Sequence, residues 1–168
     1  PYAATKRSME LLGWVYYRTH GLDVSIVRPF SVYGPGCRPE LVVHKFLEAA
    51  RSGKPAKIFG DGSAARDFSY VNDVVRGMLF ASQRPGWGVY NLAGGRPVSV
   101  NELLEMVRGI TGRPLPVVYE SERPGEVRVT HADLSRTSSE LGWKAEYSMK
   151  QGLERTWQWF ISGGDATA

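Results

Sequence analysis

The stretch PYAATKRSMELLGWVYYRTHGLDVSIVRP, residues 1–29, decides the fold of this chain. Apolar residues cover most of the helical circumference over 2–19, which predicts a helix buried on several sides. The pair His20-Gly21 predicts where that helix ends. A β-branched run at 23–29 then predicts a short strand. A buried helix that leads directly into a strand is typical of an α/β protein.

The rest of the chain continues this alternation. Capping boxes that begin at Ser99 and Ser148 predict two helix starts, and Asn72 is predicted to cap a third helix. The prolines and glycines in 29–40 predict a loop. Further helices are expected at 40–52, 72–82, 99–110, 133–141 and 148–161, and extended segments at 57–60, 68–71, 88–94 and 115–120. The fold class is therefore α/β.

Composition limits the kinds of protein that this chain can be. It has 168 residues, 42% of them hydrophobic and 23% charged, which is typical of a globular protein. The net charge of +4 is scattered, without a basic run, so we expect no nucleic-acid partner. No apolar run could span a bilayer, so we expect no membrane partner. A single cysteine, Cys37, favours a reducing, cytoplasmic location.

The sequence lacks both an initiator Met and the glycine-rich turn of a dinucleotide-binding fold. The chain opens on Pro1, without an initiator Met and directly in a helical pattern, so we expect a fragment of a longer protein. Gly94-Gly95 follows a strand but lacks the third glycine of a phosphate-binding turn. We therefore expect the glycine-rich cofactor cradle to lie outside this sequence.

Tyr2 and Lys6 form a candidate acid/base pair. They are four residues apart, so they share one helix face. A Y-x-x-x-K spacing alone is most often two ordinary helix residues. A phenol titrates near pH 10, however, and a neighbouring ammonium favours its anionic form. General-base catalysis at neutral pH needs that kind of support.

Five segments resemble, in the same order, the extended short-chain dehydrogenase/reductase family. The first, PYAATK, is similar to the family's catalytic S-P-Y-x-x-x-K segment. Within the second, GPGCRPEL (34–41) is similar to the G-P-x-x-R-P-D-M segment of UDP-glucuronate 4-epimerases. The five segments are PYAATK (1–6), RPFSVYGPG (28–36), FGDGSAARDFSYVNDVVRG (59–77), VYNLAGG (89–95) and RPGEVRVTHADLSRTSSELGW (123–143). The chain thus resembles the carboxy-terminal half of an NAD-dependent epimerase/dehydratase.

The resemblance implies a fold and a division into parts. The fold would be the carboxy-terminal part of a Rossmann-type doubly wound sheet plus a small α/β substrate-binding domain. Residues 1–36 would complete the NAD-binding domain. Residues 37–162 would form mainly the substrate-binding domain, with 59–95 partly returning to the Rossmann sheet. Residues 163–168 would be a frayed tail.

The resemblance also assigns roles around the cofactor. Tyr2 would deprotonate a sugar hydroxyl, and Lys6 would hydrogen-bond the nicotinamide ribose of bound NAD. Pro29, Phe30 and Val32 would line the nicotinamide pocket. The cofactor is therefore expected to be NAD.

The substrate implied by the resemblance is a UDP-sugar. Arg66 and Arg123 would bind its diphosphate, since guanidinium suits phosphate oxygens. Glu126, where relatives often have Asp, would lie near the nucleoside. Ser31 and Arg38 would contact the sugar, and an arginine there favours a uronate.

Other polar residues are expected to be structural. Cys37 would be a spectator in its loop. Asp67 and Asp73 lie six residues apart with no His or Cys near, so no metal site is expected. Asp73 is expected to interact with the amino terminus of its own helix.

The expected function is a sugar-nucleotide epimerase that works through a keto-sugar and acts on a UDP-hexose, with a UDP-uronate 4-epimerase first. The protein would be a homodimer when full length, and this chain alone would be inactive. Three alternatives stay open: an NAD-dependent sugar-nucleotide dehydratase or decarboxylase, a non-catalytic NAD-binding scaffold, and a stand-alone substrate-binding domain.

Overall fold

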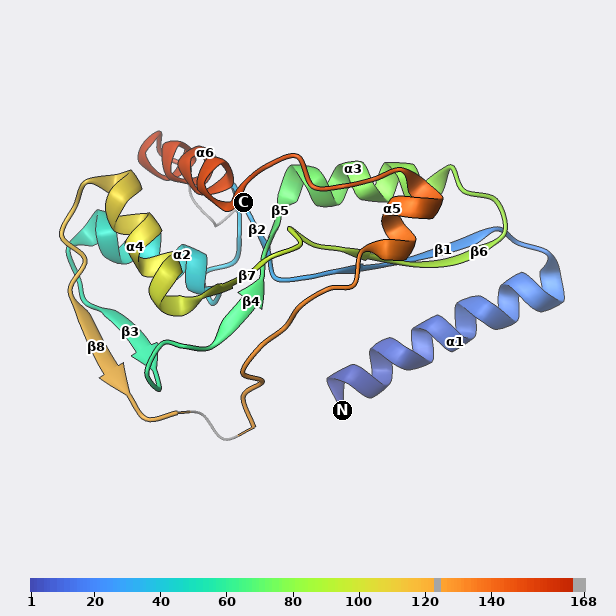
Figure 1. The fold of residues 1–168 in the computed structure, drawn as a ribbon, viewed down its shortest axis with the longest axis horizontal. Helices are drawn as coiled ribbons and strands as arrows, with labels where there is room; N and C mark the ends of the chain where they lie inside the picture. Colours follow the sequence, from blue (N-terminus) through green and yellow to red (C-terminus); the bar gives the residue numbers. More distant parts are fainter. Residues whose placement is uncertain (123–124, 165–168) are drawn as a thin grey trace.

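The computed structural model describes residues 1–122 and 125–164 and forms two groups of elements joined by short strands (Figure 1). The first group holds the predicted buried helix and the strand that follows it. Its elements are α1 (Tyr2–His20), β1 (Val24–Pro29), α3 (Val71–Ser82), β6 (Trp87–Leu92) and α5 (Ser135–Leu141).

The second group packs three helices beside a pair of strands (Figure 1). Its elements are α2 (Val42–Ser52), β3 (Ala56–Phe59), α4 (Val100–Thr111), β8 (Val117–Glu120) and α6 (Met149–Ile161). Four short strands lie between the groups: β2 (Val32–Tyr33), β4 (Ala65–Asp67), β5 (Ser69–Tyr70) and β7 (Pro97–Ser99).

Strands β1 and β6 pair in parallel, from Val24 opposite Trp87 to Pro29 opposite Leu92. Helices α1 and α3 lie on opposite sides of this pair (Figure 1). Helix α3 packs closely, because a methyl group on Gly77 would meet the Leu92 side chain. Parallel strands with helices on both faces are the arrangement of a doubly wound α/β fold, so the predicted fold class is confirmed.

Helix α1 is less buried than its sequence predicts. Glu10 is its one buried residue, and Leu12 is 57% exposed. The helix packs on β1 through Gly13, where a methyl group would lie 3.2 Å from Val24 Cγ1. The expectation of burial on several sides is wrong for this chain, because α1 covers only one face of the β1–β6 pair. Exposed apolar residues of α1 are Met9, Leu11, Leu12, Trp14, Val15 and Tyr16.

The main hydrophobic core lies in the second group. Leu47 of α2, Leu103 of α4 and Leu153 of α6 are fully buried there. A smaller cluster, Val74 and Leu92 with Trp143, joins α3 and β6. The helices of the main core bury side chains three or four positions apart, as in α2 and α6.

The first residues of the helices test the helix caps predicted from the sequence. Both capping boxes are present: Ser99 Oγ accepts from the Glu102 amide at 3.1 Å, and Ser148 Oγ accepts from the Gln151 amide at 3.3 Å. The predicted Asn72 cap is wrong. Helix α3 starts at Val71, because Tyr70 keeps the extended backbone of β5 up to the helix.

Two further expectations are corrected. The predicted loop 29–40 contains β2, which pairs in parallel with β5. Helix α5 begins at Ser135 and not at Asp133, whose carboxylate instead accepts a hydrogen bond from the Ser135 amide at 2.9 Å. Strands β4 and β7 pair with each other antiparallel and were not expected from the sequence.

Candidate functional site

Tyr2 and Lys6 lie on the same face of α1, as their spacing predicts. The Lys6 ammonium lies 5.5 Å from the centroid of the Tyr2 ring, so it contacts the face of the phenol. Tyr2 is 75% exposed. Both side chains line an open cleft of about 410 Å³ together with Arg28 and Pro29 at the end of β1. The cleft thus joins the candidate acid/base pair to the start of the 29–32 loop.

Glu10 belongs to the same cleft and was not identified from the sequence. Its carboxylate accepts hydrogen bonds from Arg28 Nε at 2.6 Å and Arg28 Nη2 at 2.7 Å, and also from Arg7. The Arg28 hydrogen bonds, aided by Arg7 and opposed by burial, lower the pKa of Glu10 to about 2. Its position four residues after Lys6, as the one charged residue within the apolar stretch 9–17, is the signal that could have identified it.

The loop after β1 is held by backbone and hydroxyl contacts. The Phe30 amide donates to Leu92 O at 2.9 Å. Ser69 Oγ donates to Phe30 O at 2.5 Å, and the Ser69 amide donates to Ser31 O at 3.3 Å. Ser31 itself is exposed, whereas Phe30 and Val32 are half-buried. The loop follows the carboxyl end of a parallel strand, where ligands bind in open α/β sheets.

Arg66 and Glu126 are brought together although 60 residues separate them in sequence. Arg66 Nη2 lies 3.1 Å from Glu126 Oε1, and Arg66 Nη1 donates to Ala65 O at 2.9 Å. Glu126 lines a second cleft, of about 270 Å³, together with Phe59 and Arg128. Arg123, the other candidate phosphate ligand, lies outside the described residues.

Arg38 and Cys37 lie in the connection between β2 and α2. Arg38 is exposed, and it lines neither the Tyr2 cleft nor the Glu126 cleft. Cys37 is half-buried, and burial raises the pKa of its thiol. The ring of His44 contacts the Cys37 carbonyl at 3.0 Å and not its sulfur. The thiolate form, which a nucleophilic cysteine needs, is therefore disfavoured here.

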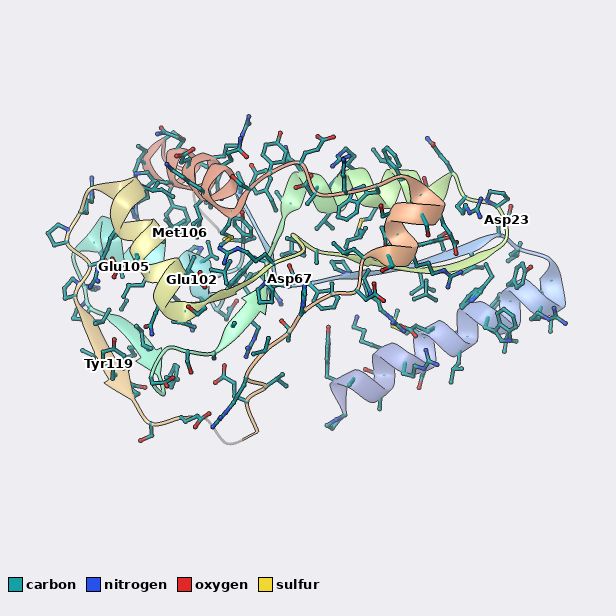
Figure 2. The ribbon with its side chains drawn as sticks, in the orientation of Figure 1. Asp23, Asp67, Glu102, Glu105, Met106 and Tyr119 are labelled. Carbon is teal, nitrogen blue, oxygen red and sulfur yellow. The ribbon has the colours of Figure 1, made fainter. Side chains whose placement is uncertain are left out.

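Asp67 and Asp73 are buried and hold distant segments together. The Asp67 carboxylate, at the end of β4 (Figure 2), accepts hydrogen bonds from the amides of Gly95 at 3.0 Å and Ala132 at 3.2 Å. Within residues 1–122 and 125–164, no three His, Cys, Asp or Glu side chains are grouped as metal ligands would be.

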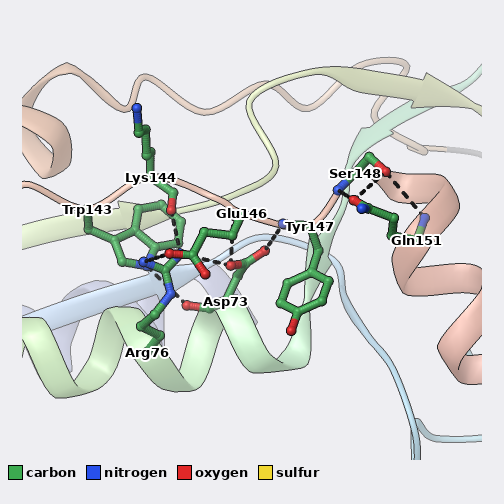
Figure 3. Close-up of polar contacts among 8 residues, drawn as sticks. All are labelled: Asp73, Arg76, Trp143, Lys144, Glu146, Tyr147, Ser148 and Gln151. Carbon is green, nitrogen blue, oxygen red and sulfur yellow. Dashed lines mark hydrogen bonds and ion pairs between the residues drawn. The ribbon is translucent and has the colours of Figure 1, made fainter.

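Asp73 has hydrogen-bond partners outside the turn of helix in which it lies. Its carboxylate accepts from the amides of Glu146 at 3.0 Å and Tyr147 at 3.1 Å, and Arg76 Nη2 donates to it at 3.0 Å (Figure 3). Asp73 lies in the first turn of α3, as the sequence predicts. Its carboxylate also binds the segment that follows Trp143, which supplies both amides.

The residues around the first cleft suit the nicotinamide end of a dinucleotide. They offer a phenol and an ammonium on one wall and the end of a parallel strand, with Pro29, on the other. The positive charges of Lys6 and Arg28 are only partly balanced by Glu10. No glycine-rich phosphate-binding turn is present in residues 1–168, so the fit extends to that end of the cofactor alone.

These features define a short-chain dehydrogenase-like α/β protein, and comparison with known families agrees. The model for the NAD dependent epimerase/dehydratase family matches residues 1–93, which is more than half of the chain. The chain therefore belongs to this family, and the resemblance inferred from the sequence is confirmed.

Known relatives are sugar-nucleotide enzymes. The chain is 41% identical over 160 residues to UDP-glucuronate 4-epimerase of Thermodesulfobacterium geofontis, covering 95% of this chain and 50% of the relative. It also resembles the crystal structure of UDP-glucose 4-epimerase with UDP-glucose from Thermotoga maritima. There the TM-score is 0.93 and the identity 36%, over 96% of this chain and 53% of that one.

A third relative is the UDP-glucuronic acid 4-epimerase of Bacillus cereus, solved in complex with UDP-glucuronic acid and NAD. Its TM-score is 0.89 at 33% identity, over 96% of this chain and 52% of that one. The chain thus spans about half the length of the relatives that it matches. In the part of the chain that the structure describes, no helix is both long and apolar enough to cross a membrane.

Proposed function

We propose that the full-length protein is a sugar-nucleotide epimerase that uses bound NAD to oxidise a UDP-hexose transiently to a keto-sugar. The observation that carries this proposal is the Tyr2–Lys6 pair, which lines a cleft at the end of β1 in a chain of the NAD dependent epimerase/dehydratase family. A phenol beside an ammonium is suited to take a proton from a hydroxyl group and to return it.

The chain's own residues divide the work of this reaction. Tyr2 Oη removes the proton from the sugar hydroxyl, and the Lys6 ammonium lies over the face of the same ring. Bound NAD supplies the hydride acceptor and donor. Pro29, Phe30 and Val32 shield the nicotinamide from water. After the keto-sugar has turned over in the site, hydride returns to the other face of the carbonyl carbon. Tyr2 Oη then returns the proton to the carbonyl oxygen.

The diphosphate of the substrate is assigned to arginines. Arg66 is half-buried beside a cleft and already holds one anion, the Glu126 carboxylate. A diphosphate oxygen would take the place of the Glu126 carboxylate oxygen at Arg66 Nη2. Arg123 is assigned the second contact, and Glu126 then turns to the nucleoside.

A UDP-uronate is proposed ahead of a neutral UDP-hexose. A buried sugar carboxylate needs a charged partner, and Arg38 and Ser31 are exposed near the loop after β1. Two of the three relatives above are named as acting on UDP-glucuronate or bind UDP-glucuronic acid. The third binds UDP-glucose, so the preference rests on Arg38.

The substrate proposal is tested by competition among UDP-glucuronate, UDP-glucose and UDP-N-acetylglucosamine in the full-length enzyme. Arg38→Met should weaken the reaction with the uronate by about 1.5–3 kcal/mol in kcat/KM, the value of a hydrogen bond to a charged group, and leave neutral sugars unchanged. Arg113→Met, just beyond the carboxyl end of α4, is the control. Equal loss for all three sugars would remove the uronate assignment and leave the epimerase.

The alternatives differ in what else they require. A dehydratase or decarboxylase shares the oxidation step, and its product would be a dehydrated or decarboxylated sugar nucleotide, which product analysis separates from an epimer. A non-catalytic NAD-binding scaffold has no need of Tyr2 and Lys6 as an acid/base pair. A stand-alone substrate-binding domain conflicts with the exposed apolar surface of α1.

We also propose that the chain divides into parts of two domains and needs a further segment, with a glycine-rich turn, to bind NAD. Residues 1–36 complete an NAD-binding domain, and residues 37–162 mainly form the substrate-binding domain, with 59–95 partly returning to the first sheet. Residues 1–168 alone are then inactive and bind no NAD at micromolar concentration, because they lack a glycine-rich turn. Calorimetric titration of this fragment with NAD tests that statement.

A further inference from the structure

Helix α1 buries one side chain, and that side chain is a carboxylate. Glu10 is 8% exposed, whereas the apolar residues at 9–17 are mostly exposed. Burying a carboxylate is costly unless it is paired and hydrogen-bonded. Three hydrogen bonds from Arg28 and Arg7 meet that need. An apolar residue would cover the same face of β1 without this requirement, so packing alone does not account for Glu10.

The ion pair connects the two parts of the candidate site. Glu10 lies one helical turn after Lys6 and two turns after Tyr2, so all three share a face of α1. Arg28 is the residue before Pro29, where β1 ends and the loop over the nicotinamide begins. The contact is bidentate, which restricts both distance and orientation. The ion pair therefore connects the helix that carries the acid/base pair with the strand end from which the loop begins.

We propose that Glu10 is a positioning residue of the active site: its bidentate contact with Arg28 sets the distance between the Tyr2–Lys6 pair and the Pro29–Val32 loop. The inference rests on the proposed function. The close approach of α1 to the sheet at Gly13 lies further along the helix, so the Glu10–Arg28 contact is nearer to the acid/base pair. A displacement of about 1 Å at a reacting group can lower a rate by roughly 100-fold.

The test uses Glu10→Gln in the full-length protein. Glutamine keeps the size of the side chain but loses the charge and one of the two acceptor oxygens. We expect kcat to fall by roughly 10- to 100-fold, while KM for the UDP-sugar changes by less than about threefold. KM should hold because Arg66, on β4, is assigned to the diphosphate and has no contact with Glu10.

A second readout does not depend on turnover. Hydrogen–deuterium exchange should become faster over residues 2–10 and 29–33 in Glu10→Gln, because both segments lose their shared restraint. Arg28→Met should produce the same pattern. The double variant Glu10→Gln/Arg28→Met should lose no more activity than the worse single variant, since the two residues act as one unit.

Asp73→Asn is the matched control. Asp73 is an equally buried carboxylate that pairs with an arginine and accepts two further hydrogen bonds, but it lies on α3 and anchors the segment at 143–148. We expect it to lower the thermal midpoint and speed exchange at 143–148 while kcat per folded molecule stays at the parent value. Glu10→Asp is kept in case Glu10→Gln does not fold.

The outcomes separate the inference from the function beneath it. A parent protein without epimerase, dehydratase or decarboxylase activity overturns the proposed function and the inference with it. An active parent whose Glu10 variants keep kcat per folded molecule, or lose only KM, overturns the positioning role alone. Additive losses in the double variant would also overturn it.

Discussion

At the scale of single residues, one face of α1 carries three different chemical groups. Tyr2 offers a phenol, Lys6 an ammonium over its ring, and Glu10 a buried carboxylate tied to Arg28. A helix repeats every 3.6 residues, so side chains four apart lie one above another. The proposed chemistry therefore depends on a spacing that is set before any tertiary contact forms.

The phenol oxygen is the group to remove first. Tyr2→Phe in the full-length protein should leave UDP-sugar binding nearly unchanged, because the ring and its contact with Lys6 remain. Turnover should fall by at least about 100-fold, the lower end of what general acid–base catalysis contributes. Steady-state rates and calorimetric binding of the UDP-sugar measure the two effects. Turnover within tenfold of the parent would exclude Tyr2 as the acid/base.

Glu10 makes stability depend on pH in a defined window. Its pKa falls from 4.5 to about 2 on folding, since Arg28 and Arg7 favour the carboxylate. A lowered pKa means that the folded state binds this proton less readily. The stabilisation is therefore fully present above pH 4.5 and is lost as the pH falls through about 2.

The measurement is urea unfolding at pH 6 and pH 3. The parent should lose on the order of 2 kcal/mol more than Glu10→Gln between these values, because glutamine has no proton to bind. Glu105→Gln, an exposed partner of Arg108, serves as the control and should follow the parent. Equal slopes for parent and Glu10→Gln would show that the ion pair is not formed in solution.

Residues with local partners were predictable and those with distant partners were not. Tyr2 and Lys6 share a face by spacing alone, and Ser99 and Ser148 find their capping partners three residues on. The partner of Glu10 lies 18 residues away, at the end of β1. No spacing rule connects a helix residue with a strand residue at that separation, so the pairing of Glu10 with Arg28 could not be predicted.

At the scale of elements, the same distinction separates long elements from short ones. Helices of eleven residues or more, such as α2 at Val42–Ser52, show their period in sequence. Strands β2 and β5 have two residues each and exist because they pair with one another. Two residues carry no period. Among the short strands that join the two groups, β5 lies within the extended segment 68–71 predicted from the sequence, whereas β2, β4 and β7 were not predicted.

Asp73 joins elements that are far apart in the chain. It connects α3 to the segment before α6, where the amides of Glu146 and Tyr147 have no strand partner (Figure 3). Asp73→Ala removes the acceptor for both amides and for Arg76. Arg76 keeps its ion pair with Glu146, but the two amides lose their acceptor, and unsatisfied buried donors are costly.

We expect Asp73→Ala to lower the free energy of unfolding by about 3 kcal/mol. Glu105→Ala, which removes an exposed ion pair on α4, should change it by no more than about 0.5 kcal/mol. Chemical denaturation of both variants gives the comparison. A loss below 1 kcal/mol for Asp73→Ala would mean that water replaces the carboxylate at little cost.

At the scale of the whole molecule, α1 presents apolar side chains that nothing in the described part of this chain covers. Leu12, Val15 and Tyr16 face away from β1 and remain about half exposed. Exposed apolar side chains at helical spacing are typical of an interface. The full-length protein is accordingly expected to be a homodimer in which α1 packs against its symmetry mate.

Leu12 is the residue to change in that interface. A two-fold axis places each substitution twice in one contact, so Leu12→Glu would expose two leucine-sized areas and bury or repel two charges. We expect the dissociation constant of the full-length dimer to rise by at least roughly 100-fold. Val118→Glu, an equally exposed apolar site on β8, is the control and should leave the dimer intact. Light scattering across a concentration series gives the mass of each. A parent that stays monomeric at high micromolar concentration would remove the dimer, and α1 would then be covered by the remainder of its own chain.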